Sequence, residues 1–301
     1  MADHTGQRVP PTLGKYVRMR ALQPTELPAH PDLAEQQKAG TPPNIQEFVL
    51  AVLEEAEGFM SRYMTQTFKI KDRSKKSPPS TAPVELLSHE ISASDIPKEA
   101  RTSEGDNSPE AWFARTSVHE NVAKDGTASW EEFDQGLRAN HSQHEMEYTP
   151  DVKDAHRILD WNNELGAVGR RVGTWEDVEM GIVEMYHHIP PPLNDRVFPV
   201  LIITAKATQD FLVVQIPVDT ASIIGAKYKL GAAKIQHAMY CSIERGELLD
   251  HGKKVKWQMA TASDAKGVLP MWAQKMGVPG AVVKDVGLFI GWVGKRRVGK
   301  V

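Results

Sequence analysis

The sequence contains one cysteine, Cys241, among its 301 residues, so no disulfide within the chain can stabilise the fold. So little cysteine is typical of a reducing compartment, and we expect a cytoplasmic protein. The N-terminal residues contain no apolar stretch of the kind that a secretory signal requires. The formal net charge of −3 lacks the basic excess of a phosphate-binding surface, which argues against nucleic acid as a partner.

Cofactor and metal motifs are equally scarce. The glycines of residues 166–173 do not follow a phosphate-binding spacing, and no predicted strand–loop–helix unit surrounds them. His141 and His144 are one helical turn apart, but no third ligand accompanies them, so we interpret them as surface histidines. We therefore expect neither a metal nor a cofactor.

The composition is that of an ordinary globular protein, with 41% apolar and 25% charged residues in a chain long enough for a substantial core. Residues 1–43 are rich in proline and predict an extended or partly ordered N-terminal arm. Residues 44–71 predict an amphipathic helix, capped by Asn44, that packs on the domain. Residues 72–109 are dense in serine, proline and charge, which predicts a mobile surface insertion. The main domain is then residues 110–301.

Segments with the alternation of β-strands dominate this main domain. Residues 112–119 alternate as a strand, residues 126–137 predict a capped helix, and residues 152–161 predict a short helix. Runs rich in β-branched and aromatic residues follow, with short connections between them. These five predicted strands are residues 178–188, 196–206, 211–219, 234–244 and 254–261. Helices first, an antiparallel meander next and a long helix last make an α+β fold.

The last apolar segment predicts the helix that covers this sheet. From Leu269 to Val293, apolar residues recur at three- and four-residue steps and form one continuous helical face. Two lysines and Asp285 interrupt the segment, which argues against a membrane anchor. Pro279 lies inside the segment and predicts a kink in the helix.

Several of these segments, in the same order, resemble the START-like or helix-grip superfamily, and more narrowly a fungal START-like family of unknown function. The segments are residues 112–119 (WFARTSVH), 126–137, 144–150, 190–202, 240–244 and 257–286. The resemblance implies a curved antiparallel β-sheet wrapped around the long C-terminal α-helix, with an apolar cavity between them. It carries over no catalytic residue, because members of the superfamily share no catalytic signature. The catalytic residues, if there are any, stay unknown.

The resemblance implies two functions. In the first, the protein binds a hydrophobic small molecule, such as a lipid, a sterol or a polyketide- or terpenoid-like compound, as a carrier or transfer protein. In the alternative, the cavity templates a reaction, and the protein is a cyclase or pericyclase of fungal secondary metabolism. Nothing in the sequence points to a partner protein, and the basic residues after the last helix predict at most transient membrane contact.

Alternation on the strands and the apolar face of the helix predict which side chains line the cavity. Composition alone favours a dry core made of these side chains, whereas the resemblance favours a cavity. The predicted ligand-binding residues are His188, His237, Met239, Cys241, Val255, Trp257, Met259, Trp272, Met276, Val283 and Val286.

Three polar residues, Arg115, Ser117 and His119, share one face of the first predicted strand and allow a catalytic interpretation. The opposite face of that strand is more apolar, so we expect the three to face solvent or the helix layer. His187 and His188 are adjacent and point to opposite sides of a strand, so one of them can reach the cavity.

Overall fold

The computed structural model describes residues 13–101, 108–191, 193–229, 231, 234–264 and 271–299, without the side chains of residues 271–276. The strands are β1 (Lys69–Lys75), β2 (Val84–Ile91), β3 (Glu110–Glu120), β4 (Val152–Asp160), β5 (Glu176–His187), β6 (Asp195–Lys206), β7 (Asp210–Pro217), β8 (Ile235–His237), β9 (Met239–Leu249) and β10 (Lys254–Asp264). The α-helices are α1 (Ala34–Gln37), α2 (Ile45–Gly58), α3 (Met64–Thr67), α4 (Trp130–Phe133), α5 (His141–Tyr148), α6 (Asn162–Ala167) and α7 (Met271–Arg297). Short 3-10 turns cover Pro24–Glu26, Pro31–Leu33 and Lys98–Ala100, and π-helical turns cover Phe59–Tyr63 and Asp134–Arg138.

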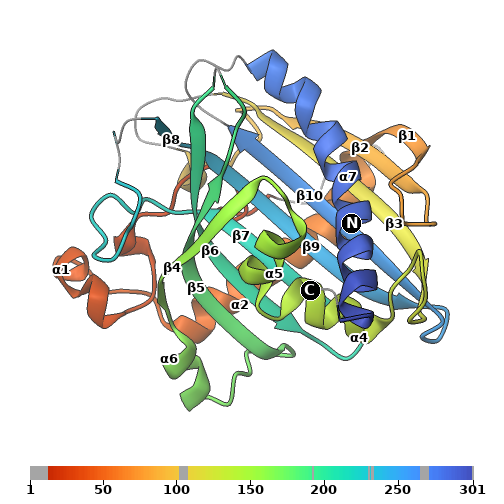
Figure 1. Ribbon diagram of the computed structural model, residues 1–301. Helices are drawn as coiled ribbons and strands as arrows, with labels where there is room; N and C mark the ends of the chain where they lie inside the picture. Colours follow the sequence, from red (N-terminus) through yellow and green to blue (C-terminus); the bar gives the residue numbers. More distant parts are fainter. Residues whose placement is uncertain are drawn as a thin grey trace, which may run out of the picture.

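The ten strands form one sheet in the order β1-β2-β3-β10-β9-β7-β6-β5-β4, with the short β8 parallel to β6. All other neighbouring strands are antiparallel, and the sheet curls at both ends around the helices on its concave side (Figure 1). β10 lies between β3 and β9, so the last strand of the chain joins the early strands to the meander. The expected α+β arrangement of a curved antiparallel sheet and a covering C-terminal helix is confirmed.

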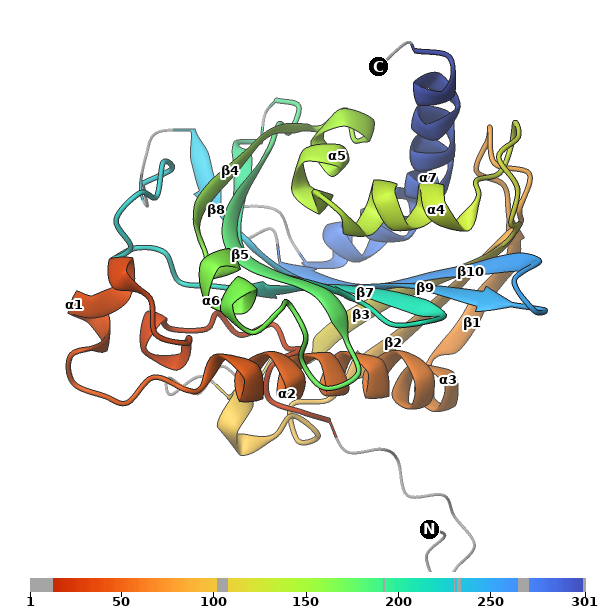
Figure 2. The ribbon, with the colours of Figure 1, turned by 90° about the horizontal axis from the view of Figure 1, so that it is seen from below.

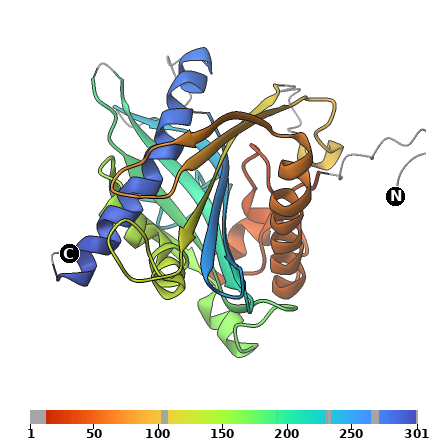
Figure 3. The same ribbon diagram turned by 90° about the vertical axis from the view of Figure 1, so that its right-hand side faces the viewer.

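Helices cover both faces of the sheet. α2 lies along the convex face, whereas α4, α5 and α7 lie on the concave face (Figures 2 and 3). The Asn44 side chain accepts hydrogen bonds from the backbone of Gln46 and Glu47, which starts α2 where the sequence predicts it. Because both faces are covered, both faces of most strands are buried, and the protein has two apolar cores.

The convex core holds the buried face of α2, the alanines of β3 and β10 and much of the N-terminal arm. Examples are Phe48, Val52, Leu22, Ala114 and Ala260. The concave core combines α7 with the opposite faces of the same strands. Its members include Trp257, Val255, Val283, Val286 and Phe289.

α7 contacts β2, β3, β10 and α5 with one apolar stripe, and Val282, Val286, Phe289 and Ile290 are buried in it. By length and hydropathy alone, its part Gly277–Arg297 would suffice to cross a bilayer. Here the stripe lies on the sheet, as in the core helix of a globular protein. The helix runs through Pro279 without ending.

The turn between β1 and β2 contacts the middle of α7. The backbone N–H of Gly287 donates a hydrogen bond of 2.8 Å to the Ser77 hydroxyl. A Cβ atom at position 287 would lie 2.4 Å from the carbonyl oxygen of Pro78, so only glycine fits there. The contact with this turn therefore fixes the position of α7 relative to the sheet at Gly287.

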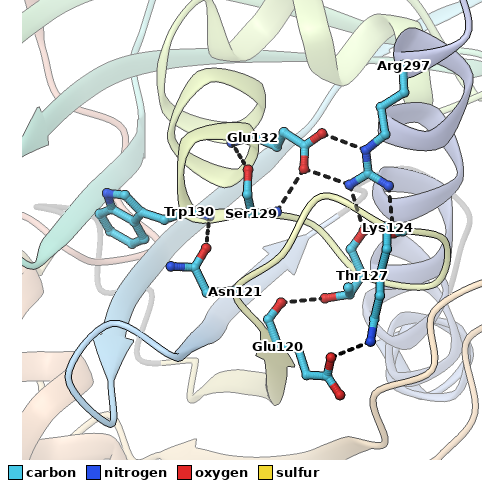
Figure 4. Close-up of polar contacts among 8 residues, drawn as sticks. All are labelled: Glu120, Asn121, Lys124, Thr127, Ser129, Trp130, Glu132 and Arg297. Carbon is cyan, nitrogen blue, oxygen red and sulfur yellow. Dashed lines mark hydrogen bonds and ion pairs between the residues drawn. The ribbon is translucent and has the colours of Figure 1, made fainter.

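The C-terminal end of α7 is held by Arg297 (Figure 4). Its guanidinium group donates to both carboxylate oxygens of Glu132, at 2.6 Å each, and to the carbonyl oxygens of Lys124 and Thr127. Glu132 is also the N3 residue of a capping box in which Ser129 caps α4. One arginine thus ties the end of α7 to the start of α4.

The structure differs from the expected elements at three places. Residues 152–161, predicted to be helical, are mostly β4, because they pair with β5 at the sheet edge. Their buried positions, Val152, Ala155 and Leu159, nevertheless recur at three- and four-residue steps, since two register shifts interrupt the pairing. Residues 72–109, expected to be a mobile insertion, contain β2 and the end of β1. The described part of the N-terminal arm is not loose, since Val17, Leu22 and neighbouring leucines are fully buried.

Candidate ligand-binding interior

Some of the predicted cavity residues lie between the concave face of the sheet and α7. Val255 and Trp257 are buried on this side of β10, and the half-buried Met259 packs beside them. Val283 and Val286 face them from α7. Trp272 and Met276 belong to the first turns of α7, whose side chains lie outside the described residues.

The face of β9 was assigned wrongly. Cys241 is buried in the convex core, and Met239 lies on the same side of β9 by alternation. In a sheet with a single core, the more apolar face of a strand turns toward that core and its ligand. Here α2 covers that face, and the more polar face, with Tyr240 and Glu244, turns toward α7.

Two predicted histidines also lie elsewhere. His188 is exposed, and its Nδ1 atom is 2.9 Å from the Asp195 carboxylate, outside the interior. Its neighbour His187 is the one on the inner side, half-buried with its ring against Phe198. His237 lies on β8, and its Nε2 atom contacts the carbonyl oxygen of Tyr228 at 2.8 Å.

A buried ion pair crosses the floor of the interior. Arg115 of β3, Met259 of β10 and Glu244 of β9 are directly opposite one another in the sheet, so their side chains point to the same face. Arg115 Nη2 is 3.2 Å from Glu244 Oε1, and the guanidinium group stacks 3.8 Å from the centre of the Trp257 ring. Arg115 has no exposed surface, so the trio on β3 faces the helix layer and not solvent.

Several atoms of this group lack hydrogen bonds. Arg115 Nε and Nη1, Glu244 Oε2 and Trp257 Nε1 are buried and make no hydrogen bond of normal geometry in the described part of the chain, although the Trp257 N–H lies close to the Glu244 carboxylate. A buried polar group without a partner costs free energy, and most proteins avoid it. The combination of free donors and free acceptors in an otherwise apolar space is typical of a polar anchor for a ligand.

Asp285 of α7 adds a second carboxyl to the interior. Burial raises its pKa to about 7; Arg115 opposes this shift, and the negative charges of Glu244 and Glu145 add to it. The side chain makes no hydrogen bond or ion pair with any residue that the structure describes. Asp285 lies deep in the protein but is only half-buried, as Tyr240 is.

A chain of hydrogen bonds links α5 to the sheet floor. His141 Nδ1 is 2.6 Å from the carbonyl oxygen of Leu137, so this nitrogen carries a proton. In the neutral ring, His141 Nε2 accepts from Gln215 at 3.1 Å, and the Gln215 oxygen accepts from Tyr240. Although burial opposes protonation, Glu145, 3.4 Å from Nε2, raises the pKa of His141. His141 is therefore buried and partnered, which corrects its interpretation as a surface residue.

The family model described as a protein of unknown function (DUF3074) matches residues 112–293, more than half of the chain. The chain belongs to the DUF3074 family. Among solved structures, human STARD10 superposes on 87% of this chain and 84% of its own, with a TM-score of 0.52 and 14% identity. Human StAR-related lipid transfer protein 5 covers 84% of this chain and 100% of its own, with a TM-score of 0.54 and 10% identity. No curated protein matches the sequence. The structural neighbours confirm the START-like, helix-grip fold of this DUF3074 protein.

Among the described residues of this DUF3074 protein, Ser117 with His119 forms an arrangement that resembles a nucleophile and its base. The two side chains are 2.8 Å apart, and the His119 ring lies between Phe133 and Trp257. Burial and the nearby charge of Arg115 lower the pKa of His119 to about 4. Such a weak base removes a proton from a serine poorly near neutral pH, so the geometry does not favour catalysis by this pair.

The described residues of the family member contain no group of three or more histidine, cysteine or acidic side chains placed to hold a metal ion. The sequence inference missed Glu244, Gln215, Tyr240 and Glu145 as interior residues. A signal for Glu244 was available, because it lies two residues from Ser242 on a strand whose other face is apolar from Met239 to Ile243. Tyr240 shares that face.

Proposed function

We propose that this protein binds a hydrophobic small molecule with a polar head group between the sheet and α7, and carries it through the cytoplasm with at most transient membrane contact. The START-like fold and the apolar walls support a lipid-like body for the ligand. The observation that carries the proposal is the Arg115–Glu244 pair, with its unpartnered atoms, in the concave core.

Burying this pair is costly if it serves stability alone. Desolvating two charges often exceeds the gain from their attraction, so an apolar pair of similar volume is commonly as stable. The free energy spent on burying the pair has a functional reason if the atoms of the pair that lack partners bind a ligand. A second buried pair, Arg18–Glu110 at 3.5 Å, lies on the convex side and provides a matched control.

Native mass spectrometry of the protein purified from a eukaryotic host tests the proposal. We expect a co-purified lipid-like molecule in the wild type and clearly less of it in the double variant Arg115→Met/Glu244→Gln. The control variant Arg18→Met/Glu110→Gln should keep the ligand, provided that circular dichroism shows both variants folded. An empty wild-type protein that takes up no added lipid, sterol or polyketide-like compound contradicts the proposal. Equal loss in both variants would assign the Arg115 pair a structural role.

The alternative function, a cyclase or pericyclase of secondary metabolism, is supported by Asp285. A carboxyl group with a pKa of about 7 is suited to donate and accept protons near neutral pH. Under this alternative, a poly-β-keto substrate is converted to a cyclic product by the wild type. Asp285→Asn would then abolish conversion while the substrate still binds. Binding without conversion in both proteins favours the carrier.

A further inference from the structure

The charges of the interior do not balance. Arg115 offsets Glu244 at 3.2 Å, and His141, when protonated, offsets Glu145 at 3.4 Å. Asp285 has no such partner among the described residues. The charged groups that act on it are Arg115 from β3, Glu244 from β9, Glu145 from α5 and Lys284 of its own helix.

These interior groups therefore carry an excess of negative charge when Asp285 is ionised. The charge of Arg115 is offset by Glu244, which its Nη2 atom contacts, although its Nε and Nη1 atoms have no partner among the described residues. Lys284 is exposed on the outer side of α7, where solvent screens its charge. An anionic head group beside Arg115 would also lie close to Glu244 and Asp285, and both carboxylates would repel it. A cation placed near Asp285 would instead be attracted by the unpaired carboxylate.

A second, independent observation points to a hydrogen-bond donor in the ligand. Glu244 is only 7% exposed, and its Oε2 atom accepts no hydrogen bond of normal geometry in the described chain, although the Trp257 N–H lies close to the carboxylate. A group that donates to Asp285 and to Glu244 Oε2 together needs at least two N–H or O–H bonds. A primary ammonium group offers three donors and one positive charge. The rings of Trp257 and Tyr148, which lie in the same core, suit a cation as neighbours.

We propose that the ligand of this interior is a lipophilic amine, whose ammonium group binds beside Asp285 of α7 and the free oxygen of Glu244. The inference deepens the proposed carrier function and rests on it. The apolar body of the amine would lie along the concave core, in contact with residues such as Val286 and Phe289.

Four probes with the same apolar chain separate the possible head groups: dodecylamine, dodecanol, dodecanoate and dodecyltrimethylammonium. Calorimetry below their micelle concentrations gives the affinities. At pH 8 we expect the amine to bind roughly tenfold more tightly than the alcohol, as for a charge-assisted hydrogen bond in a partly dry site. The trimethylammonium probe, which has the charge without donors, should lie between them. At pH 5, where Asp285 is protonated, the preference for the amine should shrink.

The variant Asp285→Asn should lower the affinity for the amine to that for the alcohol. Glu147→Gln removes a charge of the same sign from the outer side of α5 and should leave the preference intact, since its amide can still accept from Trp292. Equal affinities for amine and alcohol, or tightest binding of dodecanoate, overturn the amine inference and leave the carrier function standing. If none of the four probes binds, the carrier function itself falls.

Discussion

Replacing Asp285 by asparagine should make the folded protein more stable at pH 8, although the residue belongs to the proposed ligand site. Burial raises the pKa of Asp285 from 3.8 to about 7. In the unfolded chain the same carboxyl ionises near pH 3.8, so between about pH 4 and pH 7 the folded state keeps a proton that the unfolded state has released. The stability of the wild type should therefore fall as the pH rises through this window.

The pKa difference sets the size of the effect. Each unit of difference corresponds to about 1.4 kcal/mol, so a shift of about three units gives about 4 kcal/mol as an upper limit. Asparagine has a similar shape and does not ionise. The gain in unfolding free energy of Asp285→Asn over the wild type should thus be small near pH 4, grow up to pH 7 and then stay constant.

Urea unfolding at pH 4.5, 6, 7 and 8, in the absence of ligand and with equal m-values, measures this gain. Glu132→Gln is a control of opposite sign. Although burial acts to raise it, the hydrogen bonds from Arg297 lower the pKa of Glu132, so its contribution is present above pH 4.5 and lost in acid. The control should lose about 1 kcal/mol at neutral pH and nothing in acid. A difference for Asp285→Asn that does not change with pH, or that favours the wild type at pH 8, refutes the reasoning.

Two substitutions to alanine in α7 should act in opposite directions in the same urea assay. Gly287→Ala places a Cβ atom 2.4 Å from Pro78 and should destabilise by roughly 1–3 kcal/mol, whereas Gly280→Ala meets no atom within 4 Å and should stabilise by about 0.5–1 kcal/mol. A similar effect of both would contradict the contact at Gly287. Arg297→Ala should speed amide hydrogen exchange in the last two turns of α7, because its bonds to Glu132 and the loop carbonyls are lost; unchanged exchange would show that the end is held elsewhere. His188→Ala should leave ligand uptake unchanged, and a loss of uptake would place His188 in the site after all.

The sequence predicted the elements whose patterns are local. The three- and four-residue steps of α7 correctly predict that Val283 and Val286 face the sheet. The alternation of β10 correctly places Val255 and Trp257 on the concave face. Both predictions depend only on the pattern within a single helix or strand. Residues 152–161 predict a helix because their apolar positions recur at three- and four-residue steps. Only the pairing with β5, which two register shifts interrupt, makes them a strand.

The face of β9 could not be decided from its own residues. An apolar face normally turns to the only core available, but this sheet has two cores. The apolar side of β9, with Cys241 and Ile243, packs under α2, whose position depends on the whole fold. The polar side of β9, with Glu244 and Tyr240, therefore faces the interior. In a sheet covered on both faces, the more polar face of a strand can be the functional one.

The contact at Gly287 has a mechanical consequence. α7 is held at the β1–β2 turn and again at Arg297, so its C-terminal half is fixed at two points, whereas a Cβ atom added at Gly280 would meet no atom within 4 Å. The arm of α7 that runs from Gly287 back to Met271 is about 24 Å long at 1.5 Å per residue, and within it Val282 and Val283 are buried against the sheet whereas Gly277 and Gly280 are exposed. A rotation of about 10° at Gly287 would move the first turn by about 4 Å, close to the width of one hydrocarbon chain. The geometry therefore places any opening of the interior at the start of α7, far from its anchored end.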